Sequence, residues 1–246
     1  MTKTTIKRPF AVFDIDGTLI RWQLYHAIAE ELIKLNFLEP ADVIKIKKIK
    51  RTWEHRVNKS AYEDYESQLM FYIEKIIKTI PTSTFYDISL KVFNTYKNKN
   101  HRYTLDLINN LRAKNYLLFF ISGSPEIIVK MMTDYYNFDD FGGSHLIEKD
   151  NFLDHYSLRM TRKNKADLLR KFIKKHHATS KNSIAIGDSD SDIEMLLMVE
   201  TPLVFNPNQK LLTFAKNNNW KIIIERKNVI YELEAINGQY VLANTK

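Results

Sequence analysis

The second half of the chain alternates short apolar runs with helical patterns. Runs rich in Val, Ile and Phe predict buried strands, whereas apolar residues spaced three and four positions apart predict helices. The predicted strands cover residues 9–15, 116–121, 183–187, 202–205 and 220–224. Predicted helices lie between them at 102–114, 125–136, 163–177, 190–198 and 208–217, with a β-hairpin at 143–157. This alternation predicts an α/β fold, with a Rossmann-like parallel sheet as its core and helices on both faces.

The segment between the first predicted strand and residue 99 lacks this alternation. Apolar residues at helical spacing predict consecutive helices at 22–36, 41–59, 61–79 and 84–98. We therefore expect a core domain at 1–20 and 100–246, and an α-helical cap at 21–99 inserted after the first strand. A cap in that position would lie over the strand ends and close like a lid. The tail after residue 225 is expected to pack on the core as an extra element.

Two acidic clusters follow predicted strands. The first is Asp14-Ile15-Asp16-Gly17-Thr18, and the second runs from Gly187 to Asp192. In an open α/β sheet, ligands bind at the carboxyl ends of the strands, so both loops are expected at one site. Acidic loops brought together there would repel each other unless a cation lay between them, and Mg²⁺ prefers oxygen ligands. The pattern therefore indicates Mg²⁺ and phosphoryl chemistry.

Glycine is scarce, with only six residues in the chain. Three of them, Gly17, Gly123 and Gly187, lie in the loops that follow predicted strands. A chain that uses so little glycine is expected to need it there, for a positive φ or for close approach of the backbone.

The residues at these strand ends and helix starts suit the handling of a phosphoryl group. A carboxylate such as Asp14 can attack phosphorus, and a second one, Asp16, can protonate the leaving oxygen and later activate water. Ser122 ends its strand, where its hydroxyl and the following N–H groups could hold a phosphoryl oxygen. Lys165 opens a helix and could balance the charge of a transferring phosphoryl group. Asp188 could complete a metal site.

In this order, the motifs resemble those of the haloacid dehalogenase-like hydrolase superfamily, and the resemblance runs from about residue 9 to residue 224. The four matching motifs are Asp14-x-Asp16-Gly17-Thr18, Ser122-Gly123, Lys165, and the segment 187–192. The stretch 201–208, followed by Ala215 and Trp220, looks like the end of the phosphoserine-phosphatase-like branch. That branch carries a helical cap just after its first motif, where the helical block of this chain is predicted.

The resemblance implies a Mg²⁺-dependent phosphatase that hydrolyses a small organic phosphate monoester through an aspartyl-phosphate intermediate. Asp14 would be the nucleophile and a metal ligand. Asp16 would be the general acid and base, with its backbone carbonyl on the metal. Asp188 would be a further Mg²⁺ ligand, and Asp192 would support the metal shell or Lys165.

The resemblance also assigns the residues that bind the phosphoryl group. Ser122, Gly123 and Lys165 would bind it, with Lys165 contributing to catalysis as well. Thr18 would support the loop of the first motif. Asp190 has no counterpart in the family pattern and receives no role.

One departure from the family pattern concerns the substrate. Phosphoserine phosphatases have a Glu nine residues after the nucleophile, used on the substrate amino group, and this chain has Gln23 there. A neutral amide is a weaker partner for an ammonium group than a carboxylate. The branch also contains phosphatases for histidinol phosphate and other small esters, so Gln23 is a candidate specificity residue.

A basic segment lies in the predicted cap. Residues 45–59 carry seven Lys and Arg against one Glu, within a chain of net charge +8. One interpretation is a solvated helix face opposite an apolar stripe of Ile46, Ile49, Trp53 and Val57. The alternative is that Arg51 or Arg56 faces the active site and reads an acidic group of the substrate.

Composition narrows the setting of this chemistry. The chain has no cysteine, which excludes disulfides and thiolate catalysis and is typical of a reducing cytoplasm. No apolar run approaches the roughly 20 residues that span a bilayer. We therefore expect a cytoplasmic protein without a membrane span, whose partner is a small phosphorylated metabolite rather than a nucleic acid.

Two other functions use the same residues. The first is a phosphotransferase, which would pass the phosphoryl group to an acceptor other than water. The second is a phosphatase or binder of nucleic-acid ends, motivated by the basic cap. Haloacid dehalogenation is disfavoured because Asp16 has no use in it, and a non-catalytic binding protein is disfavoured because all four motifs are intact.

Overall fold

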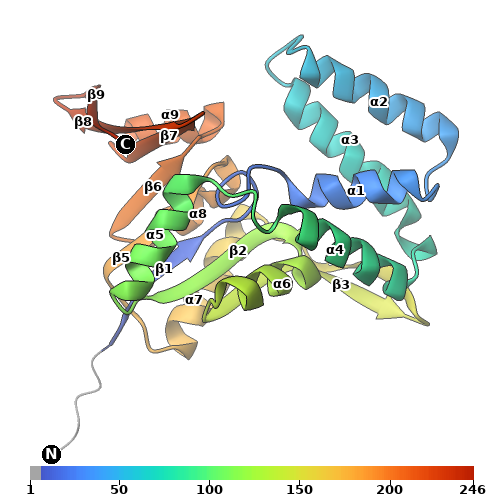
Figure 1. Cartoon of the computed structure of the whole chain (residues 1–246), viewed down its shortest axis with the longest axis horizontal. Coiled ribbons are helices and arrows are strands. Elements are labelled where there is room, and N and C mark those ends of the chain that lie inside the picture. The colour runs from blue at the N-terminus through green and yellow to red at the C-terminus, as the bar shows by residue number, and fades with distance from the viewer. Residues whose placement is uncertain (1–6) are drawn as a thin grey trace, which may run out of the picture. The chain divides into compact units, whose positions relative to one another are not determined.

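Strand β1 (Pro9–Phe13) lies in the middle of a mixed sheet in the computed structural model, which describes residues 7–246 apart from the side chain of Arg162. Parallel pairing joins β1 to β2 (Leu117–Pro125) on one side and to β5 (Thr179–Gly187) on the other. The parallel part continues with β3 (Asp140–Lys149) beyond β2, and with β6 (Thr201–Phe205) and β7 (Lys221–Arg226) beyond β5 (Figure 1).

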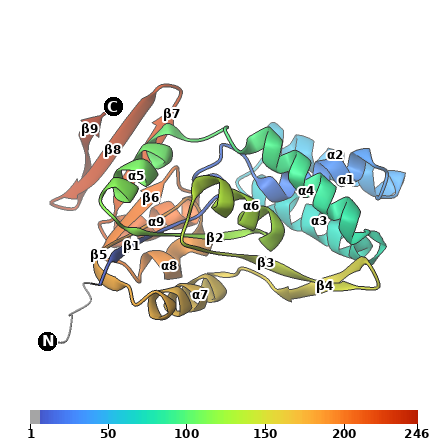
Figure 2. The same cartoon turned by 60° about the horizontal axis from the view of Figure 1, so that its bottom comes forward.

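Helices cover both faces of this parallel sheet (Figure 2). Neighbouring residues of β2 show why: Phe119 packs on Phe172 on one face, and Phe120 packs on Tyr136 on the other. Successive strand residues point to opposite faces, so a strand covered on both sides is a continuous apolar run. One face carries α7 (Arg162–Lys175), α8 (Ile193–Leu196) and α9 (Gln209–Asn217), and the other carries α5 (Arg102–Ala113) and α6 (Glu126–Tyr136). The predicted α/β fold class is confirmed.

The tail after residue 225 extends the sheet. β8 (Val229–Ile236) pairs antiparallel with β7, and β9 (Gln239–Thr245) pairs antiparallel with β8. The turn between β8 and β9 is Asn237-Gly238, with φ of 51° and 77°. Two residues with positive φ form the tight hairpin turn whose twist matches that of the strands.

Some elements differ from the sequence predictions in extent. β2 reaches Pro125 and therefore includes the serine motif, which was expected to follow the strand. The single helix expected at 190–198 is a 3₁₀ turn, η2 (Asp190–Asp192), followed by the short α8. A capping box closes the start of this turn, in which the Ser189 side chain accepts from the Asp192 N–H and the Asp192 carboxylate accepts from the Ser189 N–H.

The described chain divides into two compact units. The first contains the sheet core, up to Gln23 and over Thr95–Ser144 and Arg159–Lys246. The second contains Leu24–Asn94 and His145–Leu158. Its helices are α1 (Leu24–Lys34), α2 (Pro40–Glu54), α3 (Ala61–Ile76), the 3₁₀ turn η1 (Ile77–Thr79) and α4 (Thr82–Tyr96). That this helical unit acts as a cap stays a prediction.

The hairpin of β3 and β4 (Phe152–Leu158) groups with the helices, although its residues were expected in the core. Its contacts with the segment after α3 explain this: Leu153 N donates to Ile80 O at 3.0 Å, and Thr82 N donates to Asn151 O at 2.9 Å. Lys78 also lies 2.7 Å from Asp154.

Helix α2 is shorter than predicted and leaves its basic end exposed. It ends at Glu54 instead of residue 59, because Arg56 takes a left-handed conformation with φ of 50°. The expected apolar stripe is therefore incomplete: Ile46 is buried, but Val57 lies past the helix and is 67% exposed. None of the helices that the structure describes has the length and apolarity needed to cross a lipid bilayer.

Candidate active site

The ends of β1 and β5 are tied together by the backbone of Asp14. Its N–H donates to Ile186 O at 3.0 Å, one residue before the acidic loop of Gly187 and Asp188. The Asp14 carboxylate is buried, with 3% of the residue exposed. The central position of β1 therefore brings the first and fourth motifs to one edge of the sheet, as predicted for the carboxyl ends of parallel strands.

Lys165 joins these two motifs. Its ammonium lies 2.8 Å from Asp14 Oδ1 and 2.7 Å from Asp192 Oδ1, and the residue is 1% exposed. The first turn of α7 places it there, because the Thr161 hydroxyl caps the helix by accepting from Asn164 N. A Lys that is buried this deeply is stabilised by ion pairs on more than one side.

The second motif contacts the first through Asp16. Ser122 Oγ and Ser124 Oγ each donate to Asp16 Oδ2 at 2.7 Å, and Ser124 N donates to Ser122 Oγ at 3.0 Å. Both serines are buried, at 0% and 1% exposure, and Asp16 is 9% exposed. Ser124 was not predicted from the sequence, because β2 was expected to end at residue 121. Residues at i and i+2 of a strand share a face, so a longer predicted strand would have identified it.

Two glycines allow the loops to approach closely. Gly17 has φ of 78°, and a Cβ at this position would lie 2.1 Å from Asp188 Oδ2. A Cβ on Gly187 would lie 2.5 Å from the Asp192 carboxylate. Gly123 differs: its φ is not positive, a Cβ on it would have no protein neighbour within 4 Å, and the residue is exposed, so a need for glycine at this position stays a prediction.

Three carboxylates form a group that could hold a metal ion. Asp14, Asp188 and Asp192 each offer an oxygen, and these three oxygens lie within 4.8 Å of one another. Both Asp192 oxygens already accept hydrogen bonds, from Lys165 and from Ser189, which leaves Asp14 and Asp188 as the more available donors. Carboxylate oxygens around a small space are the donor set of a hard divalent cation.

The charges at the site are unbalanced. Burial raises the pKa of Asp14 to about 7, against the pull of the Lys165 ammonium. The pKa of Asp188 is also raised, by burial and then by the neighbouring Asp14 and Asp192 carboxylates. Burial lowers the pKa of Lys165, but the attraction of the same two aspartates exceeds this and raises it. One ammonium does not neutralise this cluster, so the residues fit a bound Mg²⁺.

Three further residues of the predicted loops and their surroundings have contacts of their own. Gln23 immediately precedes α1, and its Nε2 is 3.3 Å from where a Cβ on Gly17 would lie. Thr18 is fully buried, and its carbonyl accepts from the Thr104 hydroxyl at 2.8 Å. Asp190, which received no role, accepts from Asn208 Nδ2 at 2.9 Å.

The two candidate arginines belong to the helical unit. Arg51 lies in the last turn of α2 and Arg56 just beyond it, and both are exposed. Their role in reading a substrate stays a prediction.

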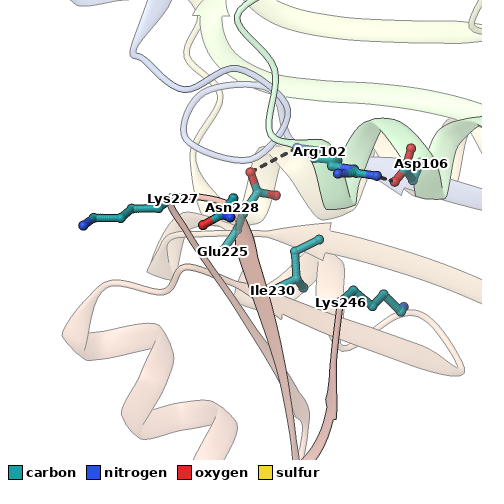
Figure 3. Close-up of a pocket in the computed structure, with 7 residues that line it drawn as sticks. All are labelled: Arg102, Asp106, Glu225, Lys227, Asn228, Ile230 and Lys246. Carbon is teal, nitrogen blue, oxygen red and sulfur yellow. Dashed lines mark hydrogen bonds and ion pairs between the residues drawn. The ribbon is translucent and has the colours of Figure 1, made fainter.

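A separate pocket lies at the start of α5 and along β8 (Figure 3). It has a volume of about 190 Å³, and none of the predicted site residues lines it. The Glu225 carboxylate at its wall accepts from the backbone N–H groups of Arg102 and Tyr103, at 3.1 and 2.9 Å. Glu225 therefore caps the N-terminus of α5, which is a structural use of its charge.

The chain belongs to the family of haloacid dehalogenase-like hydrolases, whose model matches residues 11–197. This confirms the family predicted from the four motifs. No curated protein matches the sequence.

Several solved structures share the fold of this chain. A HAD-family hydrolase from Salmonella enterica serovar Typhi is 20% identical, with a TM-score of 0.60, over 84% of this chain and 66% of that one. A protein of unknown function from Bordetella pertussis Tohama I is 14% identical, with a TM-score of 0.68, over 89% and 99%. A phosphoserine phosphatase carrying a phospho-aspartyl intermediate analogue is 21% identical, with a TM-score of 0.60, over 90% and 95%.

Proposed function

We propose that this protein is a Mg²⁺-dependent phosphatase that hydrolyses a small organic phosphate monoester through an aspartyl-phosphate. One observation carries the proposal. The second and third motifs both contact the first directly: the Lys165 ammonium lies 2.8 Å from Asp14 Oδ1, and the Ser122 hydroxyl lies 2.7 Å from Asp16 Oδ2. The fold similarity to a phosphoserine phosphatase supports the same class of reaction.

In the first half of the reaction, an Asp14 carboxylate oxygen attacks phosphorus and the bond from phosphorus to the ester oxygen breaks. Asp16, in its protonated form, gives its proton to the leaving alcohol oxygen. Ser122, Gly123 N–H and Lys165 hold the phosphoryl oxygens and offset their charge. Water is consumed only in the second half.

In the second half, water attacks the phosphorus of the aspartyl-phosphate. Asp16 accepts the proton of this water, inorganic phosphate leaves, and the Asp14 carboxylate is restored. Asp14, Asp188 and the Asp16 backbone carbonyl would hold Mg²⁺, with Asp192 supporting Lys165. Bound Mg²⁺ would offset the repulsion between carboxylate and phosphate and polarise the phosphoryl group.

The Asp14→Asn variant tests this function. An amide cannot form the acyl phosphate, so turnover of a panel of esters with Mg²⁺ should fall to background. The panel would contain an aryl phosphate, phosphoserine, histidinol phosphate, glycerol phosphate and nucleotides. Circular dichroism should show an unchanged fold, and substantial turnover by the folded variant would contradict the proposal.

Added alcohols in the wild-type reaction separate hydrolysis from phosphoryl transfer, because transfer yields a new ester.

A second candidate keeps this chemistry but acts on the phosphorylated ends of nucleic acids. A groove of about 610 Å³ on α2 presents Lys47, Lys48 and Arg51, whose side chains form no ion pair with any residue that the structure describes. Cations without a partner attract polyanions. Affinity for a 5′-phosphorylated oligonucleotide should then fall steeply as salt rises, and no binding at low salt would remove this candidate.

A further inference from the structure

Ser124 lies against the same oxygen of Asp16 as Ser122 does. Each hydroxyl is 2.7 Å from Asp16 Oδ2, and the two serines are two residues apart in β2. Ser124 also donates its backbone N–H to Ser122 Oγ at 3.0 Å. In the protein without substrate, two buried hydroxyls thus hold the same oxygen of this buried carboxylate at the same distance.

The two serines cannot keep equal roles once a substrate is present. A hydroxyl has a single proton to donate. If Ser122 turns that proton toward a phosphoryl oxygen, as the proposed function requires, its bond to Asp16 is lost. Ser124 then remains as the hydroxyl that donates to Asp16 Oδ2.

We propose that Ser124 is a positioning residue that holds Asp16 for proton transfer, an inference that rests on the proposed function. An oxygen that accepts hydroxyl protons acts as an acceptor, so the carboxyl proton of Asp16 is directed to the other oxygen, Oδ1. Ser124 thereby selects which Asp16 oxygen gives a proton to the leaving group and later takes one from water. Its hydroxyl and its N–H contact Asp16 Oδ2 and Ser122 Oγ, so it acts on the reaction through these two side chains.

The Ser124→Ala variant separates this role from a merely structural one. Proton donation matters for an alkyl ester, whose alkoxide leaves poorly, and matters little for 4-nitrophenyl phosphate, whose leaving group is stable as an anion. We expect kcat/KM to fall by about 10- to 100-fold for glycerol phosphate and by less than about threefold for the aryl ester. The kcat for both esters should fall, because Asp16 also activates water, and the aryl ester should show a burst of nitrophenol in the first turnover.

Two variants serve as controls. Ser183→Ala removes another fully buried hydroxyl, which donates to Ser180 O at the start of β5, away from the acidic loops. It should leave the ratio of the two kcat/KM values unchanged. Ser124→Thr keeps the hydroxyl and should restore the rate with the alkyl ester. An equal loss of kcat/KM for both esters in Ser124→Ala, or no loss of kcat/KM, would overturn the role of Ser124.

A crystal structure of Ser124→Ala gives a readout that does not depend on turnover. The Asp16 carboxylate should leave its position or occupy two conformers, and an unmoved, single conformer would overturn the inference. A wild type that hydrolyses no ester overturns the proposed function, while the position of Asp16 in the variant still decides what Ser124 does.

Discussion

Lys165 and Asp14 form a buried ion pair, with Nζ 2.8 Å from Oδ1 and side-chain exposures of 2% and 5%. Asp192 holds the same ammonium at 2.7 Å. The pair joins a helix start to the end of the central strand, so it contributes to the position of both. It also keeps a positive charge beside the proposed nucleophile in the absence of substrate.

Replacing this cation should affect both stability and turnover. Lys165→Met leaves Asp14 and Asp192 buried without their ammonium, which is expected to cost about 3–5 kcal/mol of unfolding free energy. Turnover should fall at least about 100-fold. Urea denaturation and ester hydrolysis measure the two effects. Lys163→Met, on the exposed part of the same helix, is the matched control and should change neither; equal losses in both variants would contradict the prediction.

Mg²⁺ should stabilise the folded protein. A cation that binds only the native state adds about 2.7 kcal/mol of stability at a concentration 100 times its Kd. The thermal midpoint should therefore rise with Mg²⁺ and return to its starting value with EDTA. Asp188→Asn removes a donor of the carboxylate cluster and should abolish the rise. Asp190→Asn, in the same loop but outside the cluster, should keep it, and an equal response of both variants would argue against this site.

A side chain at Gly17 should disrupt the loop. Gly17→Ala combines a positive φ of 78° with a Cβ that would lie 2.1 Å from Asp188 Oδ2. We expect at least a 100-fold loss of turnover, because Asp188 must move. Gly238→Ala has nearly the same φ, 77°, with no neighbour within 4 Å. This control isolates the backbone cost of alanine at a positive φ, about 1–2 kcal/mol, and should leave turnover intact. Similar kinetics for both variants would refute the steric argument.

Low pH should lower the stability of the helical unit, because His26 becomes protonated on unfolding. Burial, and then the nearby Lys50, lower the pKa of His26 to about 4, and its Nε2 is 3.9 Å from Glu66, too far for a hydrogen bond. The unfolded chain therefore takes up a proton first as pH falls. The stability from neutral His26 is present above pH 6.5 and is lost as pH falls from 6.5 to about 4, by about 3 kcal/mol in total.

The pH dependence of unfolding by urea checks this. His26→Gln should flatten the stability curve between pH 6.5 and 4.5, because the titrating group is gone. His55→Gln, which removes an exposed histidine of the same unit, should leave the slope unchanged. A wild-type slope that persists in His26→Gln would assign the acid sensitivity to other groups.

The residue at position 23 should influence which ester is preferred. The Gln23 amide lies beside the Gly17 turn, where a carboxylate would attract an ammonium group of the substrate. Gln23→Glu should raise kcat/KM for phosphoserine relative to glycerol phosphate by about tenfold, or roughly 1.4 kcal/mol. Gln209→Glu, on α9, is the charge-matched control, and an equal change of the ratio in both would exclude a local effect.

Much of the parallel core could be predicted from the sequence, because its strands are buried on both faces and appear as unbroken apolar runs. The strand at 9–15 and the loop after it are the clearest case. The hairpin after β7 was not predicted, although its Asn237-Gly238 turn is a hairpin signal, because the exposed Val241 and Leu242 leave β9 without apolar alternation. The extent of α2 depended on Arg56, whose left-handed backbone has no sequence signal comparable to that of glycine.

The candidate site shows the same division. Single residues such as Asp14 and Lys165 could be identified because motifs carry them. The contact of Ser124 with Asp16 could not, because it depends on how far β2 extends before α6 begins. Partners are set by strand register and loop length, which residue type alone does not specify.

The central position of β1 has a consequence for how the chain folds during synthesis. Phe10 pairs with Leu117, and Val12 pairs with Ala185, so both neighbours of the first strand lie more than 100 residues later in the sequence. Contacts this distant in sequence form late and slow folding. During synthesis, the acidic loop after β1 leaves the ribosome long before the fourth motif is made. Phosphatase activity would therefore report that β1, β2 and β5 have assembled, and a truncated chain ending before β5 would have none.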